Sequence, residues 1–393
     1  MKLTKSDVKD LCRTLASRQR DSDVPFYLVN LGAVNAKLAE WRRQLPRVKP
    51  FYAVKCNPDH AVLDLMVQHG TGFDVASKKE IEQCLKMGVD PSELVFANPC
   101  KLSSHIKYAA AKGVDKMTFD NVNELRKVKK LHPQAKLILR ISTDDSDSIC
   151  QFSQKFGAAR AEWLELVVTC RELNLNLVGV SFHVGSGCRD AKQYFNSIRD
   201  ARQVFDLARD YGYELSVLDI GGGFPGYPNE QGAEPSFAEL AVEINAALDK
   251  CFADLAVTVI AEPGRYMVSS AFTLITKVAT VRDNGMGDCR YYINDGVYGS
   301  FNNILHDHAQ PKPELLSTDL TSGKVAHQTC SIWGPSCDGL DQINAELYFP
   351  KLKEGDYLVW FDMGAYTGCV ATEFNGFPMP RYFYVPNGAN VQR

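Results

Sequence analysis

The chain has 393 residues, enough for two domains of ordinary size or one large barrel with an appended domain. Apolar residues make up 45% and charged residues 23%, as in globular proteins, and the net charge of −3 argues against a nucleic-acid partner. No segment approaches the ~20 apolar residues that span a bilayer, and residues 1–21 hold no apolar core of signal-peptide length. The twelve cysteines are dispersed, none spaced as CxxC. These features predict no membrane and no metal site, and free thiols in a reducing, cytoplasmic compartment.

A repeated unit of a short apolar run, a polar or glycine-bearing tip and an amphipathic stretch occupies residues 48–265, as is typical of β/α units. Strands are predicted at residues 49–54, 72–75, 94–97, 116–119, 136–139, 177–182, 215–220 and 258–261. Helices are predicted at residues 78–87, 122–131, 160–173, 191–211 and 236–251. Eight such units match a (β/α)8 TIM-like barrel, although an open doubly wound sheet shows the same alternation.

The residues at the ends of these runs favour the barrel. They are polar and chemically capable, namely Lys55, Asp74, Asn98, Asp120, Arg140, His183, Gly221 to Gly223 and Glu262. A single strand that ends in a polar residue only marks the point where the chain meets solvent. For eight strands with this mix of residue types, convergence on one pocket at the carboxyl ends of the strands is the better explanation.

After residue 265 the pattern changes to strand-like segments without long helices. Strands are predicted at residues 271–281, 290–293, 325–333, 357–361 and 381–385. The apolar run 25–31 precedes the first barrel helix, 33–45, and is assigned to this second domain. The predicted organisation is a barrel at residues 30–268 and an all-β domain formed by residues 1–29 and 269–393.

Four segments carry the chemistry. Lys55 ends the first strand among apolar neighbours, where burial can leave its amine neutral and nucleophilic. His183 offers a flat ring, followed by small residues with free backbone amides. The triplet Gly221 to Gly223 can form an anion nest, and Glu262 and Arg265 can hold a pyridine nitrogen and a phosphate respectively. Each signal alone is weak, but as a set they fit pyridoxal 5′-phosphate.

Eight ordered segments then establish a family resemblance. They are PFYAVKCN, GTGFDVASKKE, VSFHVGSGC, LDIGGGFPG, AEPGR, NDGVYGSFNNILHDH, WGPSCDGLD and DMGAYT, which run from position 50 to position 367. This chain resembles the eukaryotic-type ornithine decarboxylases, in the alanine-racemase-like class of pyridoxal phosphate enzymes. The resemblance implies a barrel with a Greek-key-like β-domain, conversion of ornithine to putrescine, and a homodimer with shared active sites.

The resemblance also implies roles for individual residues around the cofactor. Lys55 would bind the cofactor covalently, His183 would stack on its ring, and Glu262 would pair with the ring nitrogen. The phosphate would be held by Ser186, Gly221, Gly222, Gly223, Arg265 and Tyr366. Asp74, Glu80 and Arg140 would support the cofactor and Lys55.

On the substrate side, the resemblance implies that Cys337 and Asp338 enter the partner's pocket, where Cys337 would protonate Cα after CO2 leaves. Asp307 and Asp338 would bind the distal ammonium of the substrate. Tyr298 and Phe374 complete this group, and Phe374 would supply apolar surroundings for the substrate carboxylate.

Three alternatives remain open from the sequence. A lysine or arginine decarboxylase of the same fold would use the same carboxylates, but a glutamate at position 307 goes with arginine, so Asp307 favours ornithine. His306 stands where many relatives have tyrosine, which leaves lysine as a side substrate. A non-catalytic relative would bind a regulatory protein, and a racemase would need a second base in place of Cys337.

The last feature is a basic stretch at residues 101–130. In relatives the equivalent region can bind the inhibitory protein antizyme, which makes an antizyme-like regulator one candidate partner here. By composition alone, such a stretch is more typical of a solvated helix face.

Overall fold

A computed structural model describes residues 3–226, 235–285, 289–316 and 326–385 of the chain. The chain forms two compact units, Leu38–Tyr266 and the combination of Met1–Lys37 with Met267–Arg393. The boundary between the two units at Lys37 and Leu38 lies within α2 (Leu31–Gln44), whereas the sequence predicts that the barrel begins at residue 30. We call the first the barrel unit and the second the sheet unit.

The barrel unit is a closed ring of eight parallel strands. They are β2 (Val48–Ala53), β3 (Gly72–Val75), β4 (Leu94–Phe96), β5 (Lys116–Phe119), β6 (Lys136–Arg140), β7 (Asn176–Ser181), β8 (Val217–Asp219) and β9 (Thr258–Ala261). The first and last strands pair directly, with Val48 opposite Val259. This closure confirms the predicted barrel and excludes the open doubly wound sheet.

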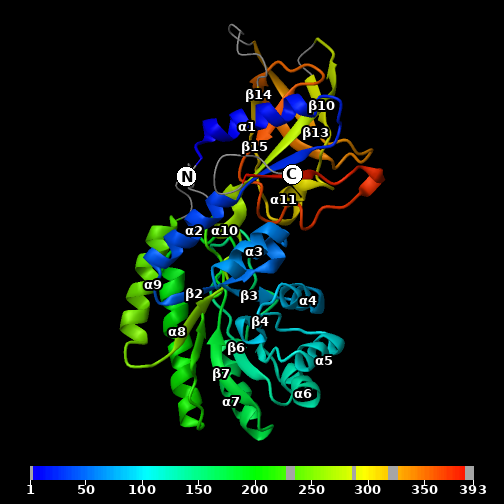
Figure 1. The fold of residues 1–393 in the computed structure, drawn as a ribbon. Helices are drawn as coiled ribbons and strands as arrows, with labels where there is room; N and C mark the ends of the chain where they lie inside the picture. Colours follow the sequence, from blue (N-terminus) through cyan, green and yellow to red (C-terminus); the bar gives the residue numbers. More distant parts are fainter. Residues whose placement is uncertain (1–2, 227–234, 286–288, 317–325, 386–393) are drawn as a thin grey trace. The chain divides into compact units, whose positions relative to one another are not determined.

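Helices lie on the outside of these strands (Figure 1). They are α3 (His60–Gln68), α4 (Lys78–Lys86), α5 (Ser103–Ala111), α6 (Val122–Leu131), α7 (Trp163–Glu172), α8 (Lys192–Asp210) and α9 (Phe237–Cys251). Polar side chains begin several of them, because the first backbone N–H groups of a helix lack internal partners. Ser77 caps α4, Asn121 caps α6, and Ser236 caps α9.

The barrel interior is filled by apolar side chains from several strands. Phe51, Val95, Ile138 and Ile260 form one buried cluster contributed by β2, β4, β6 and β9. A barrel packed in this way is a core and not a channel, so chemistry is confined to its ends.

The sheet unit contains eight strands with mixed directions. The hydrogen-bonded order is β12 (Pro313–Leu316), β15 (Tyr357–Trp360), β10 (Phe272–Asp283), β11 (Cys289–Ile293), β13 (His327–Trp333) and β14 (Gln342–Pro350), while β1 (Phe26–Asn30) pairs with both β10 and β16 (Arg381–Val385). The apolar run 25–31 therefore belongs to this sheet, as predicted. Strands β12 and β14 were not predicted, and residue 325, the expected start of β13, lies outside the described residues.

The sheet unit also contains helices, which the sequence did not predict. The larger is α1 (Lys5–Arg18), and α11 (Asn303–His306) is a single turn. Val8, Cys12 and Leu15 of α1 belong to the same buried cluster as Phe26 of β1. Their spacing of four and three residues is that of one helix face, a signal hidden by the many charges around it.

In the described part of the chain, no helix has both the length and the apolar character needed to cross a membrane.

Candidate active site

Five reactive side chains lie at the carboxyl ends of barrel strands. They are Lys55 after β2, Asp74 in β3, Arg140 at the end of β6, His183 after β7 and Glu262 after β9. The carboxyl ends of parallel strands meet at one mouth of a closed barrel. The charges of Asp74, Lys55 and Arg140 all act on the Glu262 carboxyl, as expected for groups that share one space. The structure thus brings the predicted barrel residues together.

Lys55 lies in a single turn of 3-10 helix, Val54–Cys56, that follows β2 directly. Its Nζ donates a hydrogen bond to Oδ2 of Asp74 and forms an ion pair with it. The Asp74 side chain is fully buried, whereas that of Lys55 is 42% exposed and can be reached from the mouth. Asp74 therefore orients the amine.

Asp219, the last residue of β8, belongs to the same group although the sequence analysis assigned it no role. It is completely buried, and its Oδ1 accepts a hydrogen bond of 2.9 Å from the Gly221 amide. Burial raises the pKa of Asp219 to about 7. Burial and then the charge of Asp219 raise the pKa of Glu262 well above its ordinary range. Two adjacent buried acids of this kind retain a proton between them near neutral pH.

His183 is held as a neutral ring. Burial lowers its pKa well below the ordinary value, and the positive charges of Arg140 and Lys55 lower it further. Its Nδ1 accepts a hydrogen bond of 3.1 Å from the Gly185 amide, so the ring proton resides on Nε2. A neutral flat ring at this position can lie against an aromatic cofactor without competing for its protons.

The glycine triplet after β8 forms a cradle against the His183 segment. Gly221 has a φ of +64°, and a Cβ there would lie 2.1 Å from the Phe182 carbonyl oxygen. A Cβ on Gly222 would lie 2.8 Å from His183 Nε2. Beside the cradle, Arg265 donates a hydrogen bond of 3.2 Å to Ser186 Oγ. A hydroxyl and a guanidinium thus lie beside a glycine backbone that has no side chains to keep an anion away.

The sheet unit carries the other predicted residues. The Tyr298 hydroxyl donates to the Asp338 carboxylate, and the rings of Tyr298 and Phe374 pack with centroids 4.3 Å apart. Cys337 approaches the Asn375 amide oxygen through both its backbone N and its Sγ, each at 3.3 Å. The structure therefore groups Tyr298, Asp338 and Phe374, and sequence alone did not indicate the contact between Asn375 and Cys337.

Two further predicted residues lie elsewhere in the sheet unit. Asp307 directly follows α11, and its backbone N–H donates to the Asn303 carbonyl at 3.0 Å. Tyr366 has a φ of +54°, in the left-handed region that non-glycine residues rarely adopt. Such a conformation at a loop position is typical of residues held for a function.

We expect Asp219→Asn to change how stability depends on pH in the cofactor-free protein. An unfolded aspartate titrates near ~3.9, whereas burial raises the pKa of Asp219 to about 7 in the folded state. Between these values the folded protein keeps a proton that the unfolded chain has released, so the free energy of unfolding falls as pH rises, by at most ~1.4 kcal/mol per pH unit. Urea unfolding across this range should show a shallower decline in the variant. An identical slope in both proteins would contradict a protonated Asp219.

Comparison with known proteins agrees with this geometry. Residues 31–269 match the family described as "Pyridoxal-dependent decarboxylase, pyridoxal binding domain". The ornithine decarboxylase of Rattus norvegicus is 46% identical over 396 residues, covering 97% of this chain and 85% of that protein. This chain belongs to the family of eukaryotic-type ornithine decarboxylases.

Proteins with other functions are also similar to this chain. Antizyme inhibitor 2 of Xenopus laevis is 46% identical over 386 residues, covering 95% of this chain and 83% of that protein. Among solved structures, the arginine decarboxylase of Paramecium bursaria Chlorella virus superposes with a TM-score of 0.91 at 33% identity, covering 96% of this chain and all of that one. These similarities therefore establish the family over nearly the whole chain.

The barrel residues fit pyridoxal phosphate, the cofactor of this decarboxylase family. Oδ1 of Asp74 and Oδ2 of Asp219 are buried without a hydrogen-bond partner among the described residues. Together with Glu262, these buried acids would be stabilised by a positive charge at the mouth, and a protonated pyridine would supply one. The glycine cradle would be filled by any Cβ, as expected of a surface that receives a phosphate. Amine, neutral ring, acids and anion cradle thus occur together in one barrel.

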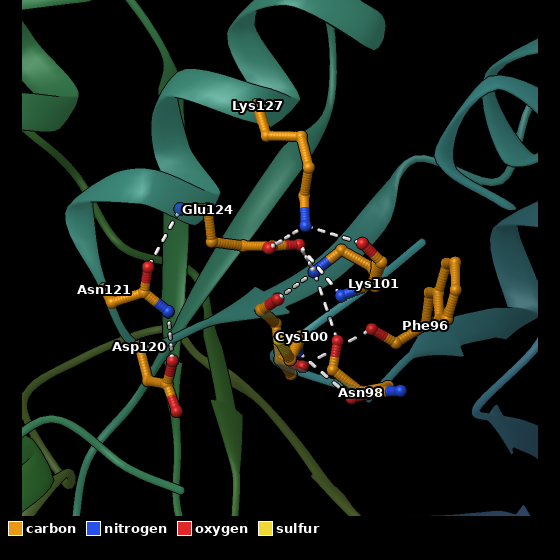
Figure 2. Close-up of polar contacts among 9 residues, drawn as sticks. Phe96, Asn98, Cys100, Lys101, Asp120, Asn121, Glu124 and Lys127 are labelled. Atoms are coloured by element: carbon orange, nitrogen blue, oxygen red, sulfur yellow. Dashed lines mark hydrogen bonds and ion pairs between the residues drawn. The ribbon is translucent and has the colours of Figure 1, made fainter. Parts of the chain in front are cut away.

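Lys107, Lys112, Arg126 and Lys130 of the basic stretch at residues 101–130 are exposed, as on a solvated helix face, but Lys101 is an exception (Figure 2). The Lys101 side chain is completely buried, and its Nζ lies 2.9 Å from Oε1 of Glu124, which is only 2% exposed. Lys127 reaches the other oxygen of Glu124 at 2.6 Å. Lys116 begins β5 and points its ammonium toward the Ser92 carbonyl. Lys101 is thus part of the barrel's internal structure and is not available to a protein partner.

Proposed function

We propose that this protein decarboxylates L-ornithine to putrescine with pyridoxal phosphate as cofactor. The similarity to ornithine decarboxylases over 97% of the chain supports the proposal most directly. The grouping of Lys55, Asp74, His183 and Glu262 at one barrel mouth supplies the chemistry that the reaction needs. When bound, pyridoxal phosphate acts as a sink for the electron pair of the broken Cα–CO2 bond.

The barrel residues would hold the cofactor at the mouth. Lys55 would bind its aldehyde carbon, with Asp74 directing the amine toward it. His183 would lie against one face of the ring, and Glu262 would keep the ring nitrogen protonated, with Asp219 behind it. The phosphate would be bound by Ser186, Gly221, Gly222, Gly223, Arg265 and Tyr366.

Arg140 would balance the acids at the mouth. Its positive charge lowers the pKa of Glu262 and of Asp219. In return, Glu262 is the charge that most favours the protonated form of Arg140. Glu80 accepts a hydrogen bond of 2.5 Å from the Ala76 amide and would keep the segment after β3 in place. These contacts favour a mouth whose charge is matched to a cationic ring and a dianionic phosphate.

The sheet unit would supply the substrate contacts to the active site of a partner subunit in a homodimer. Asp307 and Asp338 would bind the distal ammonium, and the Tyr298 hydroxyl would orient Asp338. The Cys337 thiol would deliver the proton to Cα after CO2 departs. Phe374 is 40% exposed, so its ring would be accessible to a substrate.

Asp307→Glu tests the proposed substrate. We expect the unaltered protein to release CO2 faster from ornithine than from lysine or arginine. The glutamate variant should lose kcat/KM for ornithine by ~10-fold or more, since a change of one methylene in a pocket is worth ~1 to 3 kcal/mol. Asp356→Glu, at a turn before β15, serves as a control for the same chemical change. Faster turnover of arginine by the unaltered protein would overturn the substrate assignment.

A second candidate is a non-catalytic protein that acts by binding antizyme, which the likeness to antizyme inhibitor 2 favours. The presence of Lys55, His183, Glu262, Arg265 and Cys337 argues for catalysis instead. An absorbance scan of the purified protein separates the two, since cofactor bound to Lys55 absorbs near the visible edge. An antizyme-like partner would have to contact exposed residues of the 101–130 stretch, since Lys101 and Glu124 are buried.

The proposed compartment is the cytoplasm. The described residues form no disulfide bond, which agrees with a compartment where glutathione and thioredoxin keep proteins reduced.

A further inference from the structure

The segment between β6 and the first turn of α7 lies against the part of the chain that carries His183 and Ser186. We define this segment, residues 142–158, as the strap. Its two ends meet at the end of β6, where Ile141 and Ala158 form a parallel bridge. The Ala158 amide donates to the Arg140 carbonyl at 2.9 Å, and the Ser142 amide donates to the Ala158 carbonyl at 3.0 Å. The base of the strap is therefore fixed to the strand that presents Arg140.

Asp120, after β5, fastens the base from a second side. Its Oδ2 accepts a hydrogen bond of 2.9 Å from the Gly157 amide. Gly157 has a φ of +103°, and a Cβ there would lie 2.8 Å from the Ser142 backbone. Figure 2 shows Asp120 beside Asn121, at the start of α6, close to the buried pair of Lys101 and Glu124. Asp120 thus ties the base of the strap to the end of β5.

Several residues of the strap form hydrogen bonds to residues 183–187. Thr143 Oγ1 donates to the His183 carbonyl at 3.0 Å, and Ser148 Oγ donates to the Val184 carbonyl at 2.6 Å. Cys150 and Ser186 exchange two backbone hydrogen bonds of 3.0 Å each. The backbone around His183 and Ser186 is thus held by the strap over its whole length.

Two glycines let the strap approach this closely. A Cβ on Gly185, which has a φ of +84°, would lie 2.6 Å from Ser148 Cβ. A Cβ on Gly187, with a φ of +68°, would lie 2.7 Å from Ile149 Cδ1. The sequence suggested that these small residues leave backbone amides free for an anion. The Gly185 amide is instead given to His183 Nδ1 and the Ser186 amide to the Cys150 carbonyl, so the glycines here serve the strap.

Phe152 extends the contact to the imidazole itself. Its ring meets that of His183 edge to face, with centroids 4.9 Å apart and planes at 72°. Aromatic pairs of this kind contribute more stabilising free energy than the burial of their surface alone, and they prefer this edge-to-face geometry. The backbone of Phe152 is fixed in turn, because its amide donates to Oδ2 of the buried Asp145 at 2.5 Å.

We propose that the strap is a positioning element for the cofactor, with Phe152 setting the orientation of the His183 ring and Ser148 setting the backbone before Ser186. The proposal deepens the proposed function and rests on it, since His183 and Ser186 matter only if they meet the cofactor ring and phosphate. Phe152 and Ser148 act through their neighbours and are positioning residues.

The test combines hydrogen exchange with cofactor binding in full-length Phe152→Ala and Ser148→Ala. Loss of one hydrogen bond or ring contact should raise amide exchange across residues 183–187 by about tenfold, with no change at residues 221–223. Both variants should bind pyridoxal phosphate about tenfold more weakly in a titration of the cofactor-free protein. Phe152→Tyr, which keeps the ring, should restore both values. Gln154→Ala changes an exposed strap residue and should match the unaltered protein.

Unchanged exchange at residues 183–187 in both variants would overturn the proposal, as would an equal effect of Gln154→Ala. Faster exchange with unchanged cofactor affinity would also overturn it, because the strap would then be only structural. If the unaltered protein binds no pyridoxal phosphate, the proposed function fails, and with it the role of the strap toward the cofactor. The exchange data would still show whether the strap holds residues 183–187.

Discussion

Replacing Lys55 with alanine is expected to lower decarboxylase activity at least about a thousandfold, equivalent to ~4 kcal/mol of transition-state stabilisation. The variant retains the barrel and its anion cradle but has no amine at the mouth, so the cofactor binds without a covalent link and product release slows. CO2 release measured with ornithine gives the loss, and borohydride reduction of the loaded protein should label Lys55 only in the unaltered chain.

Lys49→Ala is the matched control for this experiment. Lys49 belongs to the same strand, but it lies near the opposite end and pairs with Glu93 at 2.5 Å. Its removal should leave activity within about twofold, since a partly exposed ion pair contributes ~1 kcal/mol or less to stability. Labelling of a lysine other than Lys55 would contradict the assignment.

The inactive Lys55→Ala protein also tests the shared active site. In a homodimer with composite sites, Lys55 and Cys337 of one site come from different subunits. Mixing Lys55→Ala with Cys337→Ala and allowing subunit exchange would give half heterodimers, each with one intact site of two, and thus about a quarter of full activity. A mixture as inactive as its components would show that each site is built from one chain.

The barrel and the reactive strand ends could be predicted because both follow from local patterns. A polar residue directly after a buried strand, as with Lys55 and His183, must lie at the mouth once the sheet closes. Closure itself was only favoured by the sequence, because the pairing of Val48 with Val259 joins residues far apart in the chain. The substrate side rested on the family resemblance alone.

Asp219 and Lys101 show why the rest could not be predicted. Asp219 lies inside an apolar run, and only the folded barrel shows that its carboxyl adjoins Glu262. Lys101 belongs to a charged stretch that looks solvated, yet its ammonium is buried against Thr118 and Glu124. Burial depends on which distant segments pack together, and charge patterns carry no such information. The missed helix α1 is a similar case, since its apolar face is visible only against β1.

Glu262→Gln is expected to lower kcat about 100-fold to 1000-fold while KM changes little, because the lost interaction is strongest as charge flows into the cofactor ring. Glutamine has the shape of glutamate but no negative charge, so it cannot stabilise a proton on the ring nitrogen. Glu262→Asp keeps the charge at a greater distance and should lose less. Steady-state CO2 release separates kcat from KM for the three proteins.

The size of this effect depends on the surroundings of Glu262. Burial and the charges of Asp219 and Asp74 raise the pKa of its carboxyl well above the ordinary range, so the surrounding acids favour its neutral form, which resembles glutamine. A cationic ring nitrogen would oppose this preference, because its charge would compensate the buried acids and favour an ionised Glu262. Glu93→Gln removes a carboxylate at the other end of the barrel and should leave kcat within about twofold. A loss of less than about fivefold in Glu262→Gln would mean that the ring nitrogen is not kept protonated at this position.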